Sequence, residues 1–226
     1  GPAMMPPTDA IYLIRYRADG VRDWVYTSPG GVGGGCRPLL HAVAVGAGGD
    51  SYVGGFGCGI DFGAGTSNSG FVARIDSSGN QVGDVRFGNC TAPGCFVGVY
   101  DLAVTTSEVV LAGVLVGEHD FGGGPVDGGP FAPVLIFLGA DLSLRGTRVF
   151  PSVDGWTWIQ RITPTHDGGF VLAGLYNGVF GIDSTLPPTP TVGGNPVVLD
   201  GGDLMNVFVT RLDPNQAPPQ RRAAAA

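Results

Sequence analysis

The amino-acid sequence predicts an all-β protein built as an array of repeated, four-stranded antiparallel units. Two observations lead to this expectation. The first is composition: 41 glycines and 18 prolines among 226 residues, with 43% hydrophobic and only 14% charged residues, are typical of short apolar strands joined by many turns. The second is internal repetition, because two different sequence elements each recur at a spacing of about 60 residues.

The first repeated element is an apolar stretch with an arginine near its end. Residues 71–76 (Phe-Val-Ala-Arg-Ile-Asp) recur as residues 208–213 (Phe-Val-Thr-Arg-Leu-Asp) and, less closely, as residues 12–17 (Tyr-Leu-Ile-Arg-Tyr-Arg). A weaker copy covers residues 134–138. Glycine together with Asn or Asp follows three of the four copies, and these residues supply the positive φ that tight hairpins require. We therefore expect a strand and then a hairpin turn at each copy.

The second repeated element is a short apolar strand that ends in glycine. It reads Tyr-Val-Gly-Gly at residues 52–55 and Val-Leu-Ala-Gly at residues 110–113 and 171–174. An apolar stretch and a turn precede each copy, and a motif with one aspartate follows it. The order within a unit is then strand, turn, strand, Gly-rich loop, strand, turn, strand, with β-branched and small residues in the middle strands. The repeated aspartates are Asp61, Asp120 and Asp183.

Four antiparallel strands at this period are typical of a β-propeller blade. We expect about three and a half units, thirteen strands in all, either as an irregular small propeller or as a segment of a larger one. The last unit lacks its fourth strand, which the half-unit at the start is placed to supply, and open sheet edges are expected to favour self-association. The repeat domain covers residues 10–213, after a cloning scar and lead at 1–9 and before a tail at 214–226. Its units are residues 10–28 (partial), 37–89, 98–151 and 158–213.

The repeated motifs resemble those of a known family. A strand ending in Gly-Gly, then Ile-Asp-Phe-Gly at residues 60–63, then Phe-Val-Ala-Arg-Ile-Asp followed by Ser-Ser-Gly-Asn, is similar to the bacterial β-propeller repeats of the seven-bladed type. Such repeats are abundant in surface and secreted proteins of GC-rich bacteria such as myxobacteria. The likeness is close in residues 41–89, fair in 98–150 and poor in 175–204. It implies export to the cell surface, the periplasm or the extracellular space, and a scaffold or binding role without shared catalytic residues.

The charge distribution and the lengths of the apolar runs exclude two classes of partner. The net charge is −7, all twelve basic residues are arginine, and they form no basic cluster in the interior of the sequence. Nucleic-acid binding needs a basic face, so we expect no nucleic-acid partner. No run of about 18 apolar residues exists, so we expect no membrane insertion.

Four cysteines are consistent with disulfides in an oxidising compartment. Propeller topology favours the pairs Cys36–Cys58 and Cys90–Cys95, because in each case the two cysteines fall in loops at the same end of a unit. The alternative is a bridge between Cys36 and Cys95, which hold equivalent positions in adjacent units. Buried free thiols are the remaining possibility.

The repeated aspartates have two interpretations. Asp61, Asp120 and Asp183 are candidate ligands for a metal such as calcium, but one aspartate in every unit does not supply the several oxygens that calcium needs. The favoured interpretation is that each aspartate accepts hydrogen bonds from its own turn. We therefore expect no cofactor.

The candidate ligand-binding residues are Asp154, Trp156, Trp158, Tyr176 and Asn195. In a strand, Trp156 and Trp158 point to the same face, with Thr157 opposite. The long loop between residues 175 and 204 is the most irregular segment. The sequence thus favours a non-catalytic module that presents loops to a protein or polysaccharide. One alternative is a carbohydrate-active enzyme that uses aspartates at the propeller mouth, and another is a self-assembling repeat segment.

Overall fold

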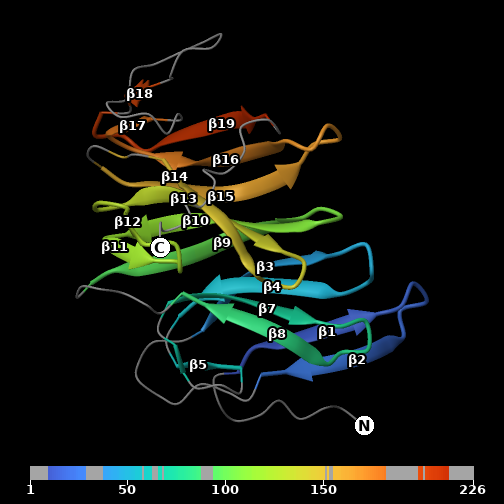
Figure 1. Cartoon of the computed structure of the whole chain (residues 1–226). Coiled ribbons are helices and arrows are strands. Elements are labelled where there is room, and N and C mark those ends of the chain that lie inside the picture. The colour runs from blue at the N-terminus through green and yellow to red at the C-terminus, as the bar shows by residue number, and fades with distance from the viewer. Residues whose placement is uncertain are drawn as a thin grey trace, which may run out of the picture.

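The computed structural model describes residues 10–28, 38–57, 59–62, 66–67, 69–87, 94–150, 152, 155–181, 198–200 and 202–213. These residues form strands and turns and contain no helix, which confirms the all-β class (Figure 1). Every pair of neighbouring strands is antiparallel. Within these residues there is therefore no helix that could cross a membrane.

Four main sheets follow one another along the described part of the chain. The first sheet contains β1 (Tyr12–Tyr16) and β2 (Arg22–Thr27), and the second contains β3 (Leu39–Val45), β4 (Ser51–Phe56), β7 (Gly70–Ile75) and β8 (Gln81–Arg86). The third sheet contains β9 (Phe96–Val104), β10 (Glu108–Val116), β13 (Ala132–Gly139) and β14 (Leu144–Val149). The fourth sheet contains β15 (Thr157–Pro164), β16 (Phe170–Tyr176) and β19 (Asn206–Leu212). Two sheets thus have the four antiparallel strands that the repeats predict.

A small hairpin is inserted between the second and third strands of each of the last three sheets. The sequence predicts only a Gly-rich loop with an aspartate motif there. The inserted hairpins are β5 (Ile60–Asp61) with β6 (Thr66–Ser67), β11 (Glu118–Asp120) with β12 (Pro125–Asp127), and β17 (Val179–Gly181) with β18 (Val198–Asp200). Strands of two or three residues are too short to show an alternation of apolar and polar residues, which explains why the pattern misses them.

The first strand of each of these three sheets carries a β-bulge at the same place. The unpaired residues are His41 in β3, Tyr100 in β9 and Gln160 in β15. Opposite each bulge stands the glycine that ends the second repeated element. A Cβ atom on Gly113 would lie far inside van der Waals contact with the carbonyl oxygen of Gly98, and the equivalent glycines in the other two sheets face the same obstacle. The repeated glycine is therefore required by the close approach of the bulged strand.

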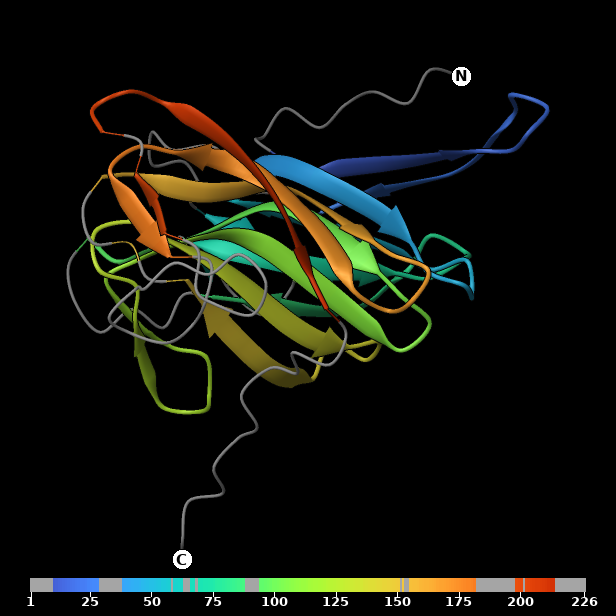
Figure 2. The same ribbon diagram turned by 90° about the horizontal axis from the view of Figure 1, so that it is seen from above.

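The sheets stack face to face in chain order, and Figure 2, which looks along the stack, shows them overlying one another. Strand β9 packs against β3 and β4, and β15 packs against β9 and β10. Alternate residues of one strand face opposite neighbours: Val53 and Phe71 pack toward the first sheet, whereas Tyr52 and Val72 pack toward the third. The chain thus has three apolar interfaces, one between each pair of successive sheets.

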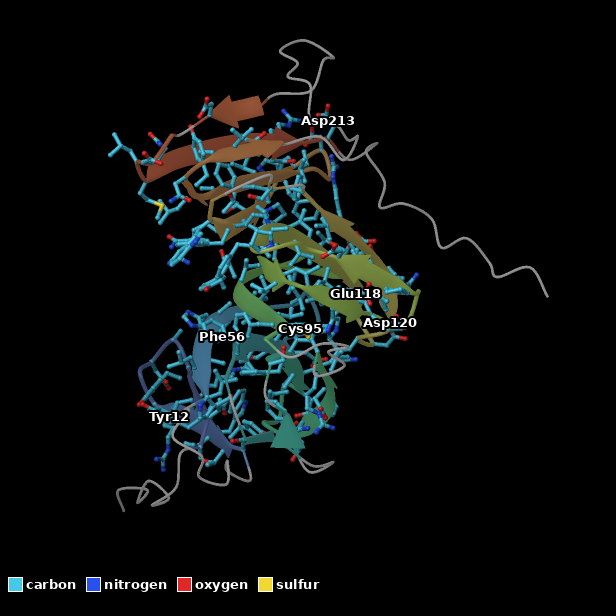
Figure 3. The ribbon with its side chains drawn as sticks, turned by 90° about the vertical axis from the view of Figure 1, so that its left-hand side faces the viewer. Tyr12, Phe56, Cys95, Glu118, Asp120 and Asp213 are labelled. Carbon is cyan, nitrogen blue, oxygen red and sulfur yellow. The ribbon has the colours of Figure 1, made fainter. Side chains whose placement is uncertain are left out.

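The described sheets do not close into a ring. The β1–β2 sheet and the β15–β16–β19 sheet lie at opposite ends of the stack (Figures 1 and 3). Strands β1 and β2 pair only with each other in the described part of the chain, so the expectation that this half-unit supplies the fourth strand of the last sheet is wrong. The hairpin instead packs its face against the second sheet, where Ile11 and Tyr26 join the core.

Candidate ligand-binding surface

Two of the predicted ligand-binding residues lie side by side at the start of the fourth sheet. Trp156 precedes β15 and Trp158 lies within it, while Thr157 between them is completely buried. The alternation expected for an extended strand is therefore present. Trp156 is 54% exposed. Asp154 and Asn195 lie outside the described residues, so their role in ligand binding stays a prediction.

The two tryptophans and a phenylalanine form what we call the tryptophan cluster: Phe131, Trp156 and Trp158. The rings of Trp156 and Phe131 are stacked, with centroids 5.1 Å apart and planes inclined by 27°. The centroids of Trp156 and Trp158 are 6.5 Å apart. Phe131 comes from the segment that leads into β13, so the cluster joins the third and fourth sheets. Sequence reasoning missed Phe131 because its contact with Trp156 depends on how the third and fourth sheets stack.

The backbone fixes Trp156 in place. Its amide donates a hydrogen bond to Oδ1 of Asn177, and the Asn177 amide donates to the Trp156 carbonyl oxygen at 3.0 Å. Gly155 has a φ of +86°, and a Cβ atom there would collide with the Asn177 backbone. The main chain that carries the exposed indole is therefore fixed by hydrogen bonds to Asn177.

Tyr176, the third predicted residue that the structure describes, faces the other way. It pairs directly with Thr157 across the β15–β16 ladder, and residues directly opposite each other in a ladder share a face. It packs against Phe208, with ring centroids 6.3 Å apart, beside the core between the third and fourth sheets. Tyr176 is therefore not part of the tryptophan cluster.

A second group of rings lies between the second and third sheets. This group, the histidine–tyrosine cluster, consists of His41, Phe56, Phe96 and Tyr100, and Figure 3 labels Phe56. His41 and Phe56 are stacked at 4.7 Å, and both meet Tyr100, at 5.4 and 5.3 Å between centroids. His41 and Tyr100 are the bulged residues of their strands. The signal that could have found them is their shared position in the repeat.

The histidine–tyrosine cluster favours uncharged side chains. Burial, and then the positive charge of Arg161, lower the pKa of His41. Burial raises the pKa of Tyr100. Both rings are therefore neutral near pH 7, while the exposed guanidinium of Arg161 supplies a cation beside them. Together they offer apolar ring faces and hydrogen-bonding groups in one place.

Asp120, the repeated aspartate whose side chain the structure describes, acts within its own turn. Oδ1 of Asp120 accepts hydrogen bonds from the amides of Gly122 at 2.7 Å and Gly124 at 3.0 Å, as the favoured interpretation expects. The side chain of Asp61 and the whole of Asp183 lie outside the described residues. Within the described ranges, no three His, Cys, Asp or Glu side chains come together as a metal site would require.

The aspartate pKa shifts have the same local origin. In Asp76, Asp141 and Asp167, hydrogen bonds from Asn80, Ser143 and Thr165, respectively, are the largest cause of a lowered pKa. A general acid would need a raised pKa instead. These three carboxylates therefore stabilise their own turns, and Asp167 also accepts a hydrogen bond from Arg211 on β19.

One cysteine falls within the described residues. Cys95, immediately before β9, is disulfide-bonded. Cys36, Cys58 and Cys90 lie outside the described residues, so both proposed pairings stay predictions.

Comparison with known proteins gives no relative: no protein-family model matches the chain, and no curated protein sequence matches it significantly.

Proposed function

We propose that this chain is a non-catalytic, β-propeller-like module that binds a polysaccharide, with a protein ligand as the alternative. The binding surface is formed by the first strand of each of the last three sheets, namely β3, β9 and β15. The observation that carries the proposal is the tryptophan cluster, in which a 54% exposed Trp156 is stacked on Phe131 and held by its own backbone. Large apolar side chains that stay exposed and rigid in a folded protein mark binding surfaces.

The propeller-like arrangement is supported by the positions of the first strands of the last three sheets. β3, β9 and β15 belong to successive sheets, and β9 packs against both of the others. In a propeller the blades are arranged around a central channel, on which loops and strand ends converge. The bulges at His41, Tyr100 and Gln160 would then fall at equivalent places along that channel.

The chemistry of this surface suits a sugar chain. Aromatic faces pack against the apolar faces of sugar rings, and amide, imidazole and guanidinium groups donate hydrogen bonds to hydroxyls. Because the backbone of Trp156 is already held by Asn177, little backbone entropy is lost when a ligand stacks on the indole. Export to the cell surface, the periplasm or the extracellular space, which the family resemblance implies, would bring the module to such ligands.

The test is a binding titration, followed by tryptophan fluorescence, against neutral, amino-sugar and uronate polysaccharides. Trp156→Ala is expected to weaken binding of the best ligand at least about tenfold, as loss of a central aromatic anchor does. Val82→Ala is the matched control, because Val82 is 53% exposed but lies on β8, the outer strand of the second sheet.

Unchanged affinity in Trp156→Ala would contradict the proposal that the tryptophan cluster forms the site. If no polysaccharide binds, a polysaccharide function is excluded, and the same variant pair then tests the protein alternative against captured partners.

A further inference from the structure

A sheet inside the stack takes part in two interfaces, one through each of its two faces. We call the face toward the following sheet the forward face and the face toward the preceding sheet the backward face. In the second sheet Val72 lies on the forward face and Phe71 on the backward face, and both are completely buried. All three interfaces of the chain therefore join the forward face of one sheet to the backward face of the next.

The forward face of the fourth sheet is exposed. Ladder pairing gives the equivalent positions: Val72 pairs with Gly54, Leu135 pairs with Ala112, and Val209 pairs with Ala173. Val72 and Leu135 are 0% exposed, whereas Val209 is 69% exposed. Val207, two residues earlier on the same face, is 71% exposed. The fourth sheet thus presents the apolar side chains that its predecessors bury.

The backward face of the first sheet is exposed as well. Tyr12, Ile14 and Tyr16 are 51%, 38% and 61% exposed. In the repeat they match three residues of β7 that are all 0% exposed and pack against the β1–β2 hairpin, namely Phe71, Ala73 and Ile75. Leu13, on the opposite side of β1, packs into that same core.

We propose that copies of this chain associate head to tail, with the forward face of β15–β16–β19 in one copy packing on the backward face of β1–β2 in the next. A second copy is the occupant that fits, because the two exposed faces are the two halves of an interface that the chain already forms three times. Strands rich in valine, isoleucine and tyrosine gain from being buried against such a partner. The contact is heterologous, so it forms a ring if the rotation closes and a filament if it does not.

The open edges of the sheets, through which the sequence predicts self-association, stay a separate prediction. The proposed contact uses sheet faces instead. It rests on the stacking of the sheets and not on the proposed ligand.

The experiment measures mass in solution by light scattering over a range of concentrations. The variants are Val209→Arg on the forward face and Tyr16→Arg on the backward face, with Val82→Arg as the control for an added charge at an exposed site of an internal sheet. Circular dichroism and thermal unfolding establish that each variant is folded. Wild type and Val82→Arg are expected to increase in mass with concentration, while each face variant alone stays monomeric.

Mixing the two face variants separates head-to-tail association from other modes. The Tyr16→Arg copy keeps an intact forward face and the Val209→Arg copy an intact backward face, while the two altered faces repel each other, so the mixture is expected to form heterodimers and nothing larger. A wild type that is monomeric at every soluble concentration overturns the proposal. So does a mixture that stays monomeric, or an association that one face variant leaves intact. Trp156→Ala is expected to leave the mass unchanged, so the ligand proposal and this one fail independently.

Discussion

Asp101 on β9 accepts a hydrogen bond from the backbone amide of Ile162 on β15, with 2.9 Å between Oδ2 and the nitrogen. Its other carboxylate oxygen, Oδ1, accepts from the amide of Leu102 at 3.0 Å. β15 is the edge strand of the fourth sheet, so this amide has no ladder partner on that side. One side chain thus connects the edge strands of two successive sheets.

Replacement of Asp101 is therefore expected to weaken the junction between the third and fourth sheets. Asp101→Ala leaves the Ile162 amide without its acceptor, which costs about 1–3 kcal/mol of unfolding free energy in a partly buried site. Asp101→Asn keeps one acceptor oxygen and is expected to lose less. Urea unfolding measures both, with Asp203→Ala at an exposed position as the control. Equal stability of Asp101→Ala and wild type would show that the bond contributes nothing.

The β-bulge in β9 is expected to make the stability of the third sheet sensitive to substitution of Gly113. Gly113→Ala is expected to destabilise the third sheet by about 3 kcal/mol or more, because the new methyl group meets the backbone of β9 and not a movable side chain. Gly123→Ala is the matched control, since a Cβ atom there has nothing within 4 Å. Thermal unfolding compares the two. A Gly113→Ala protein as stable as Gly123→Ala would mean that the strand relaxes away from the clash.

The repeats reveal the strands but not the bulges. The repeated apolar stretch at residues 71–76 and the turn after it identify β7 and β8, because a short apolar run that ends in a turn is typical of a strand buried on both faces. The glycine at residue 113 was visible as a repeated residue, but its cause is the approach of β9 from another part of the chain. Long-range contacts of this kind leave no local pattern.

The candidate site shows the same limit. Trp156 and Trp158 could be identified because they alternate in the sequence at the start of one strand. Phe131 joins them from the third sheet, and its proximity depends on how two sheets stack. His41 and Tyr100 are likewise brought together by stacking, and only their equivalent places in the repeat connect them in the sequence.

Acid is expected to destabilise the β11–β12 hairpin through His119. This side chain is 1% exposed, its Nδ1 has no hydrogen-bond partner in the described part of the chain, and its ring packs on Phe121 with centroids 4.4 Å apart. Burial lowers its pKa below the ordinary 6.5, although Asp120 acts in the opposite direction. The unfolded chain therefore takes up a proton near pH 6.5 before the folded chain does, and stability falls as the pH drops through that value.

His119→Gln removes this titration. The loss of unfolding free energy between pH 7.5 and pH 5 is expected to shrink by roughly 1 kcal/mol relative to wild type, as measured by urea unfolding at both pH values. His166→Gln, in an exposed turn, serves as the comparison. If the two variants lose equal stability in acid, His119 is not the sensor.

Alkali is expected to loosen the β1–β2 hairpin from the second sheet through Tyr26. Its hydroxyl donates a hydrogen bond to Oε1 of Gln81, which in turn donates from Nε2 to the Phe62 carbonyl oxygen and to Asp84. Burial, and then the charge of Asp84, raise the pKa of Tyr26 from 10.0 to about 12. The unfolded chain therefore ionises first, so the stability that this tyrosine contributes is complete below pH 10 and is lost as the pH rises toward 12.

Tyr26→Phe separates the hydroxyl from the ring. At neutral pH it is expected to cost about 1 kcal/mol through the lost hydrogen bond, and in alkali it no longer contributes to the fall in stability. Urea unfolding at pH 8 and at about pH 11 measures both effects, and ultraviolet absorbance of the tyrosinate follows the ionisation directly. Tyr12→Phe, on the exposed face of the same hairpin, is expected to match wild type at pH 8. A Tyr26→Phe protein that loses as much stability in alkali as wild type would place the alkaline transition elsewhere, with Tyr52 and Tyr100 the next residues to test because burial raises the pKa of both.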